Sequence, residues 1–433
     1  MRRNRNISGR KGERGVIILL VAIIMLFVVG AMAVLAIDVV TFYTARSEAQ
    51  IAADGAALAG ARVMANSGSA SFQSVFVESL AHNLATNAAT QVAQQNKVGG
   101  RLLNPAEVVV AFPATIGGQY NPRVSVKVTR ADLPTFFARI FGRTQVVVSA
   151  TATAEAYNPS GSNLALGAGG PIAPVCTKPW LLPNLDPTGS GNPIFNANGT
   201  IVNPSPVGQS WPLQAACDSC TGVLSTAAGQ YFPASIDPTG TDPQQFLEPT
   251  QSLPVGSTGF TSYQKAVAGC VPQPISCGLN ANFKIDTGAY VNTSGVDRNA
   301  DTIQAVKLLI HDNGADGDSD SIDAIAVPSP PFQFVAGNAN PVIGAAGQNV
   351  LVSNSLVTVP VYDYQGLVSS SPVQVIGFLQ LFLSPLGTTL PAGSSPIQAE
   401  IINMAGCGNA ASGQPILGTG ASAIPVRLVA STP

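Results

Sequence analysis

The sequence is poor in the side chains on which most enzymes and nucleic-acid-binding proteins rely. Charged residues make up 10% of the 433 residues, against about 25% in ordinary soluble proteins. Histidine occurs only at His82 and His311, which argues against a histidine-based metalloenzyme or hydrolase. The G-x-S-x-G, P-loop and H-E-x-x-H motifs are all absent from the chain. We therefore expect a protein that is not an enzyme and has no catalytic or cofactor-binding residues.

Positive charge is lacking over most of the chain. Residues 157–433 carry six basic and fifteen acidic side chains, whereas a phosphate backbone attracts a basic surface. We therefore expect no nucleic-acid partner. The basic residues gather instead at the start, where residues 1–15 hold six of them and a single acid, Glu13.

A long apolar run follows this basic tail. Val16 to Ile37 contains neither charge nor proline, and a helix of that length spans about 33 Å, enough for a hydrocarbon core of about 30 Å. Basic residues before a membrane helix stay in the cytoplasm. We therefore expect a cytoplasmic tail (1–15), a transmembrane signal anchor (16–37) and an exported remainder. The alternative is a cleaved signal peptide with Ala31-Met32-Ala33 as its cleavage site, although such apolar regions usually have about 7–15 residues.

The helix is predicted to continue beyond the membrane, to about residue 65. Alanines recur there every fourth residue, at Ala45, Ala49, Ala53, Ala57 and Ala61. Small residues at this spacing form one strip of a helix and allow close approach of a second helix. Alanine is also the best helix former, so the strip indicates either a packing face, including self-association through residues 45–61, or a plain helix.

The same region resembles a known family. The basic tail, the apolar run ending near Asp38 and the string ADGAALAGA from Ala53 to Ala61 resemble the N-terminal segment of TadG-like proteins. The resemblance covers about residues 10–65 of this chain. These proteins belong to the tight-adherence (Tad, or Flp pilus) assembly machinery of bacteria. The resemblance implies a cell-envelope component in the inner membrane. Many TadG-like chains also carry a von Willebrand A-type domain, whose D-x-S-x-S metal motif is absent here.

Residues 38–156 are predicted to form a juxtamembrane helix and a small α/β module. An amphipathic helix is expected over residues 71–96, followed by strands at Glu107–Phe112 and Arg123–Thr129, a short helix at Leu133–Phe141 and a β run at Thr144–Tyr157. The resemblance implies the same order of elements.

The composition then changes. Residues 157–433 hold 29 of the 33 prolines, which predicts a linker at 157–175 and a mainly-β exported domain with long loops at 176–433. Its clearest strands are expected at Leu356–Tyr364, Val373–Ser384, Gln398–Met404 and Pro425–Ala430. The VQVIGFLQLFL run within the second of these is apolar on both faces, which is typical of a buried central strand.

All six cysteines lie in the exported domain, at Cys176, Cys217, Cys220, Cys270, Cys277 and Cys407. An even number in an oxidising compartment favours disulfides, and the spacing does not choose among the fifteen pairings. The alternatives are free or redox thiols and a zinc site in which Cys217, Cys220, Cys270 and Cys277 supply four thiolates.

An acidic loop near residue 316 is the other candidate site. Asp316, Asp318 and Asp320 alternate as at the start of a calcium loop, with Asp312 nearby. An EF-hand would continue with Gly at 321 and Glu at 327, but Ser321 and Val327 stand there. The loop is therefore either a weak calcium site or a solvated acidic turn.

Together these features predict a structural or scaffolding membrane component of a Tad pilus assembly or secretion apparatus. Its partners would be the membrane and other pilus-assembly or secretion proteins. The alternatives are an exported adhesin or ligand-binding module that uses the acidic loop to hold calcium, and an envelope hydrolase whose site the sequence does not reveal.

Overall fold

We describe the fold from a computed structural model of the chain. The structure describes residues 13–72, 74–113, 121–158, 173–188, 191–197, 199–215, 229–236, 246–253, 255–280, 283–285, 298–312, 318–326, 329–363, 373–384, 397–407 and 422–429.

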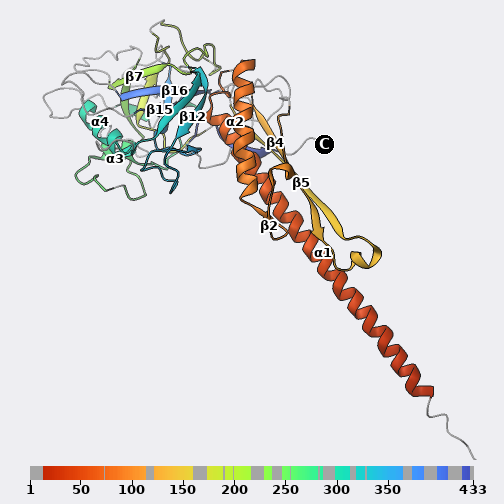
Figure 1. Ribbon diagram of the computed structural model, residues 1–433. Helices are drawn as coiled ribbons and strands as arrows, with labels where there is room; N and C mark the ends of the chain where they lie inside the picture. Colours follow the sequence, from red (N-terminus) through yellow and green to blue (C-terminus); the bar gives the residue numbers. More distant parts are fainter. Residues whose placement is uncertain are drawn as a thin grey trace, which may run out of the picture.

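The chain begins with one unbroken helix, α1 (Glu13–Asn66), so the predicted continuation beyond the membrane segment is confirmed. The apolar run makes up its N-terminal half, where Leu26 and Phe27 are each 74% exposed and no other described segment lies against the helix (Figure 1). The run has a mean hydropathy of 3.2, and α1 is the one helix among the described residues that is long and apolar enough to cross a membrane. These properties fit a single-pass membrane protein.

The second half of α1 is covered by a small α/β module. It comprises α2 (Val75–Gln94) and an antiparallel sheet of β3 (Val108–Ala111), β4 (Arg123–Pro134), β5 (Gln145–Ala156) and β17 (Val426–Val429), in the order β17-β5-β4-β3. The Ser74 hydroxyl caps α2 by accepting a hydrogen bond from the Val77 N–H. The small elements β1 (Lys97–Val98), β2 (Arg101–Leu102) and η1 (Pro105–Glu107) join α2 to β3.

The structure differs from the sequence-based prediction between β4 and β5. A helix over Leu133–Phe141 was expected, but β4 continues to Pro134 and only η3 (Ala138–Phe141) forms, as a 3-10 turn. Leu133 pairs with Val146 across the hairpin and is fully buried. Burial of Leu133 in the sheet therefore overrides the local helical signal.

The module's sheet includes a strand from the other end of the sequence. In β17, Val426 pairs with Ala156 of β5 and Val429 pairs with Thr153. The chain thus leaves the module after β5, forms the C-terminal domain and returns to add β17.

The C-terminal domain, predicted over residues 176–433, contains a closed, barrel-like sheet. Its strands follow the order β8-β6-β14-β15-β16-β7, and β7 pairs back with β8 to close the ring. Strand β15 pairs with β14 on one side and with β16 on the other. Its apolar side chains from Val375 to Leu383 are buried, as its sequence predicts. The six strands are β6 (Trp180–Pro183), β7 (Ser210–Ala215), β8 (Gln230–Ile236), β14 (Leu356–Tyr362), β15 (Val373–Leu383) and β16 (Ile397–Gly406).

Smaller elements surround this barrel. Two helices, α3 (Ser262–Ala268) and α4 (Arg298–Leu309), pack together, and β9 (Gly278–Asn280) and β10 (Phe283–Ile285) extend the sheet. A separate three-stranded sheet, β11 (Ser321–Ala326), β12 (Ser329–Val335) and β13 (Asn349–Val350), lies against α2 through β12. Figure 1 shows the barrel at the far end of α1 from its membrane half.

The predicted alanine strip is part of the module's core. Ala45, Ala49, Ala53, Ala57 and Ala61 are each at most 1% exposed, and they share one core cluster with α2 and the sheet. On α2 the buried face repeats the same four-residue spacing, at Val77, Ala81, Ala85, Ala89 and Ala93. The small side chains thus allow close packing within the chain, and exposed positions of α1 such as Ser47 and Ile51 lie beside the strip.

Gly60 marks the closest approach in this interface. A Cβ on Gly60 would lie 2.8 Å from Cγ1 of Val124 on β4 and 3.5 Å from Cβ of Ala89 on α2. The lack of a side chain at Gly60 therefore allows the close approach of β4, and an added methyl group would require a shift of Val124.

Replacing both Ala53 and Ala57 with leucine tests this packing. We expect each added side chain to lower the free energy of unfolding by about 1–3 kcal/mol, because a packed interface has no room for three more carbons. Limited proteolysis of the detergent-solubilised chain should then cleave residues 75–156 faster.

The matched control is Thr44→Leu with Ser47→Leu, which adds bulk at exposed positions of α1. This variant should resist the protease like the unchanged chain. Equal resistance of the two double variants would contradict a packing role for the strip.

Candidate functional site

A hydrogen-bonded junction fixes the end of α1 to the C-terminal domain. Buried Asn403 of β16 donates from Nδ2 to the Ala65 carbonyl of α1. The Ser71 hydroxyl donates to the Met404 carbonyl at 3.0 Å and accepts from the Met404 N–H at 2.9 Å. Asn158, just after β5, donates from Nδ2 to both the Ala70 and Met404 carbonyls. The helix, the module and the barrel therefore meet in one network of buried polar groups.

Gly68 is required at this junction because its backbone is left-handed and close to the barrel. Its φ is +82°, and a Cβ there would lie 2.9 Å from the Ile402 carbonyl oxygen. The Phe332 N–H of β12 donates to the carbonyl of the preceding Ser67 at 3.1 Å. A side chain at residue 68 would separate the helix end from β16.

Four of the six cysteines form two disulfides. Cys176 is bonded to Cys270 and Cys277 to Cys407, with Cα–Cα distances of 4.3 and 5.7 Å. Cys217 and Cys220 lie outside the described residues. Because Cys270 and Cys277 are each paired elsewhere, neither is available as a thiolate for the alternative zinc site.

Each disulfide links segments of the C-terminal domain that are distant in the sequence. The first joins the segment before β6 to the residue after the C-cap of α3, and the second joins the start of β9 to the end of β16. The sequence separations are 94 and 130 residues. Closing loops of this size stabilises the folded state by about 4–5 kcal/mol each in the chain-entropy account.

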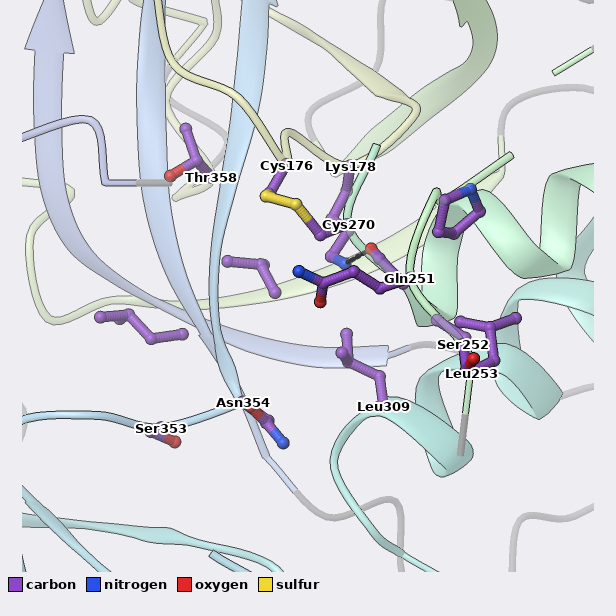
Figure 2. Close-up of a pocket in the computed structure, with 15 residues that line it drawn as sticks. Cys176, Lys178, Gln251, Ser252, Leu253, Cys270, Leu309, Ser353, Asn354 and Thr358 are labelled. Atoms are coloured by element: carbon purple, nitrogen blue, oxygen red, sulfur yellow. Dashed lines mark hydrogen bonds between the residues drawn. A yellow bond between two sulfur atoms is a disulfide. The ribbon is translucent and has the colours of Figure 1, made fainter. Parts of the chain in front are cut away.

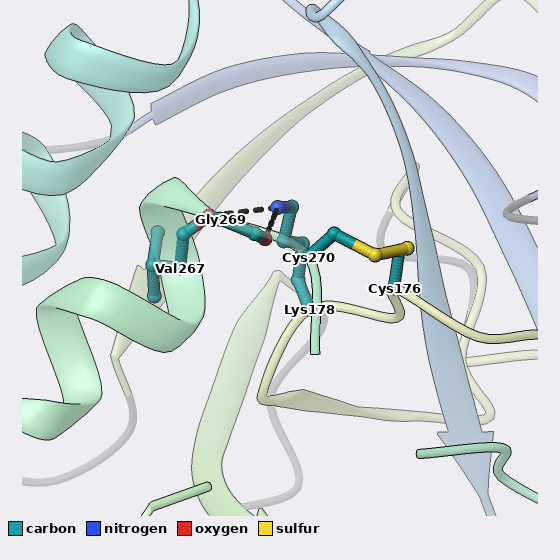
Figure 3. The surroundings of a disulfide bond; sticks show 5 residues. All are labelled: Cys176, Lys178, Val267, Gly269 and Cys270. Carbon is teal, nitrogen blue, oxygen red and sulfur yellow. Dashed lines mark hydrogen bonds between the residues drawn. A yellow bond between two sulfur atoms is a disulfide. The ribbon is translucent and has the colours of Figure 1, made fainter. Parts of the chain in front are cut away.

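Lys178 is a buried cation beside the first disulfide (Figure 3). Its side chain is only 4% exposed, and its Nζ donates to the carbonyls of Val267 and Gly269 at 2.7 and 2.9 Å. These carbonyls stand at the C-terminal end of α3, where helical carbonyls lack partners and the helix dipole favours a cation. Lys178 therefore caps α3 from the strand side of the domain.

Burial lowers the pKa of the Lys178 amine to about 7. The cause is the loss of the water that would solvate the charge. The two carbonyl acceptors favour the charged form and oppose this change, but they replace only part of the water shell. Sequence analysis did not single out this lysine, because a single Lys beside a proline is ordinary on a protein surface.

Lys178 and the disulfide border a cavity of about 330 Å³. Figure 2 shows Gln251, Asn354 and Thr358 around the same space. Leu253, Leu309 and Leu356 supply apolar lining. Since the two acceptors hold Nζ against the end of α3, we interpret the amine as a structural group and not as a nucleophile.

A second buried network, of three aromatic residues and a threonine, holds the helices to the barrel. Trp180 of β6 donates from Nε1 to the Tyr263 hydroxyl of α3 at 3.1 Å. Thr302 of α4 binds the hydroxyls of both Tyr263 and Tyr231. The run between Pro179 and Pro183 predicts that Trp180 docks onto the core of the domain, and Trp180 is fully buried. Sequence analysis did not find Tyr231, Tyr263 or Thr302, which lie far apart in the chain and follow no common pattern.

The acidic loop is only partly described. Asp316 lies outside the described residues, whereas Asp312, Asp318 and Asp320 lie within them. Asp320 is buried, and its two carboxylate oxygens accept from the Gly337 N–H at 2.8 Å and the Asn340 Nδ2 at 2.9 Å. The structure thus gives Asp320 a role in holding the segment after β12. Among the described residues, no three His, Cys, Asp or Glu side chains gather as metal ligands would.

The two histidines stand in unrelated environments. His82 of α2 stacks on Phe112, with ring centroids 3.8 Å apart, and burial lowers its pKa while Glu78 opposes the change. His311 follows α4, and its Nε2 lies 2.9 Å from Asn354 Nδ2. The structure therefore does not bring the two imidazoles into one site.

A groove of about 430 Å³ lies between α2 and the β12–β13 pair. Carboxamide side chains line it from both sides, and none of its lining residues is charged: the amides are Asn66, Asn87, Gln91, Gln95, Gln333, Gln348 and Asn349. At the end of α1, Asn66 is 4% exposed, and its Oδ1 accepts no hydrogen bond from the part of the chain that the structure describes. Carboxamides both donate and accept, so the groove suits a neutral ligand that does the same, such as a polypeptide main chain.

Comparison with known proteins identifies one segment. Residues 15–63 match the family profile Tad, described as Flp pilus-assembly TadE/G-like. The match confirms the resemblance seen in the N-terminal sequence and supports a pilus-related role. It covers the membrane run and the alanine strip and ends just before the junction. No curated protein and no solved structure matches the chain.

The pKa of Lys178 predicts a rise in stability with pH. Between about pH 7 and 10 the unfolded chain binds a proton at this lysine that the folded chain has released, so the free energy of unfolding increases, by at most about 1.4 kcal/mol per pH unit. Below pH 7 both states hold the proton and the cost of burying the charge is fully present. Lys178→Met should remove the rise in thermal midpoint between pH 6.5 and 9.5.

The control for this experiment is Lys265→Met, because the amine of Lys265 is partly exposed and pairs with Glu248 at 3.0 Å. That variant should keep the pH dependence of the unchanged chain. An identical pH profile for Lys178→Met and the unchanged chain would show that Lys178 is charged in the folded state throughout this range.

The cysteine pairing can be read directly from peptide maps. We expect non-reducing digests to contain linked peptides for Cys176–Cys270 and Cys277–Cys407, because both pairs are covalently joined. The same four residues should resist thiol reagents in intact cells until a reductant is added. Recovery of a Cys270–Cys277 peptide, or labelling of Cys407 without reductant, would contradict this pairing.

Proposed function

We propose that the chain is a structural, non-catalytic scaffold of a Tad-type pilus assembly or secretion apparatus. The observation that carries the proposal is the continuity of α1, in which one helix is both the membrane segment and the core of the exported module. Such a helix transmits position from the membrane to the barrel without a flexible hinge. The family match to residues 15–63 supports the choice of apparatus.

The proposed location is the inner membrane, with the N-terminus in the cytoplasm. The six basic residues of positions 1–15 support this orientation by the positive-inside rule. The module and the barrel then lie in the periplasm or beyond, where disulfides form and persist.

A non-catalytic role is supported by how the buried polar groups are used. The amine of Lys178 is bound to the end of α3, and both oxygens of Asp320 are bound within the chain. In a scaffold, buried polar groups of this kind hold the fold together and take no part in a reaction. The alternative, an adhesin that holds calcium at the acidic loop, is less well supported because Asp320 would have to give up both hydrogen bonds.

The scaffold is expected to meet a partner at the amide-lined groove. Gln91 is exposed on the α2 wall of this groove. A photoreactive residue at position 91 should crosslink in intact cells to another protein of the pilus apparatus, identified by mass spectrometry. The crosslink should vanish in cells from which the apparatus genes are deleted.

The matched control carries the photoreactive residue at Val255, which is fully exposed and lies outside the groove. Deletion of the chain should also abolish surface pili, and the unchanged chain should restore them. Normal piliation without the chain would refute the proposed function. Crosslinks at position 91 that persist without the apparatus genes would refute the groove as the assembly contact.

A further inference from the structure

The β4–β5 hairpin runs along α1 as far as the end of the membrane segment. It starts beside Gly60, where Val124 approaches α1, and its turn is held at Asp38. At the spacing of an extended chain, Val124 to Phe136 covers about 40 Å, and the helix from Gly60 to Asp38 covers about 33 Å. Figure 1 shows the hairpin turn beside the middle of α1.

Asp38 fixes the height of the turn. Its Oδ1 accepts from the Phe136 N–H at 2.8 Å, and its Oδ2 accepts from the Phe137 and Ala138 N–H groups at 2.8 and 3.1 Å. These donors open the 3-10 turn η3. Because Asp38 directly follows the apolar run that ends at Ile37, the turn stands where the helix leaves the hydrocarbon.

The turn presents the residue types found at membrane interfaces. Phe136 is 58% exposed and Val147, just beyond the turn, is 62% exposed. Arg139 and Arg143 are exposed too, and within the described part of the chain neither side chain has an acidic partner. In segments that lie at a membrane surface, phenylalanine and aliphatic side chains enter the boundary between headgroups and acyl chains, and arginine binds phosphate.

The neighbouring surface of α1 has the same character. Val39, Val40 and Tyr43 follow the apolar run and are 58%, 64% and 77% exposed. The apolar surface of the membrane helix therefore continues past Asp38 and lies at the same height as the hairpin turn.

We propose that the hairpin turn, residues 135–143, is a second membrane contact of this protein. It lies in the headgroup layer of the leaflet nearest the exported domain, with Phe136 at the acyl boundary and Arg139 and Arg143 against lipid phosphates. A lone transmembrane helix is free to tilt and rotate, and interfacial anchors restrict both motions. Two contacts about the axis of α1 hold the barrel in one orientation above the membrane.

Tryptophan quenching in proteoliposomes tests this contact on the full chain. Phe136→Trp and Val147→Trp serve as independent reporters, so a folding defect in one leaves the other. The native Trp180 and Trp211 are at most 1% exposed within the exported domain, and the unchanged chain supplies the baseline. Ile343→Trp, at a fully exposed position of the exported domain, is the control in water.

We expect lipids brominated near the top of the acyl chain to quench the Phe136→Trp protein more strongly than lipids brominated deeper. The Val147→Trp protein should also lose emission, whereas the Ile343→Trp protein should match the baseline. If neither hairpin reporter is quenched above the baseline, the turn stays in water and the proposal is wrong. Stronger quenching by the deep bromines would refute an interfacial position.

The lipid charge tests the two arginines. In vesicles of phosphatidylcholine with one part in five phosphatidylglycerol, quenching of the Phe136→Trp protein should exceed that in pure phosphatidylcholine. Adding Arg139→Gln and Arg143→Gln should abolish the difference between the two lipids and leave the apolar contact. The same difference with and without the arginines would overturn their assignment to phosphate.

Discussion

The close approach of α1 to α2 and to the β4–β5 sheet is the contact on which the rest of the structure depends. It is possible because the facing strips carry alanine, with Gly60 where β4 comes nearest. Without side-chain bulk the backbones can pack at short distance, and the module covers one face of the helix from Asp38 to its end. The membrane half of the same helix has no such cover from the described residues.

The barrel is fixed to α1 and the module by polar contacts. Asn403 and Asn158 donate to backbone carbonyls where α1 ends, and Ser71 binds the Met404 backbone of β16. Gly68 lets the chain turn against β16. Buried polar groups hold a geometry strictly because a broken hydrogen bond there is costly. In the barrel, the Lys178 cap and the Thr302 network fasten α3 and α4 by the same means.

The arrangement suits a protein whose work is to hold position. One helix connects the membrane to the junction, the hairpin returns along it to the membrane surface, and β17 brings the end of the chain back to the module. The amide-lined groove lies between α2 and β12, where the module meets the C-terminal domain. A partner bound there would contact both parts, so its binding would depend on how they are positioned relative to each other.

The sequence by itself determined the elements whose signals are local. The uncharged run to Ile37 and the four-residue alanine repeat predict α1, and the doubly apolar run in β15 predicts a central strand. Tertiary structure alone decided which cysteines pair, that Leu133 is a strand residue, that β17 joins β5 and that Lys178 is buried. The alanine strip illustrates the physical reason. A face of small residues predicts that another element packs closely against it, but the same residues could pack against α2 of this chain or against a helix of another protein. Which element packs against the strip depends on contacts between segments that are distant in the sequence, and a local sequence pattern does not contain that information.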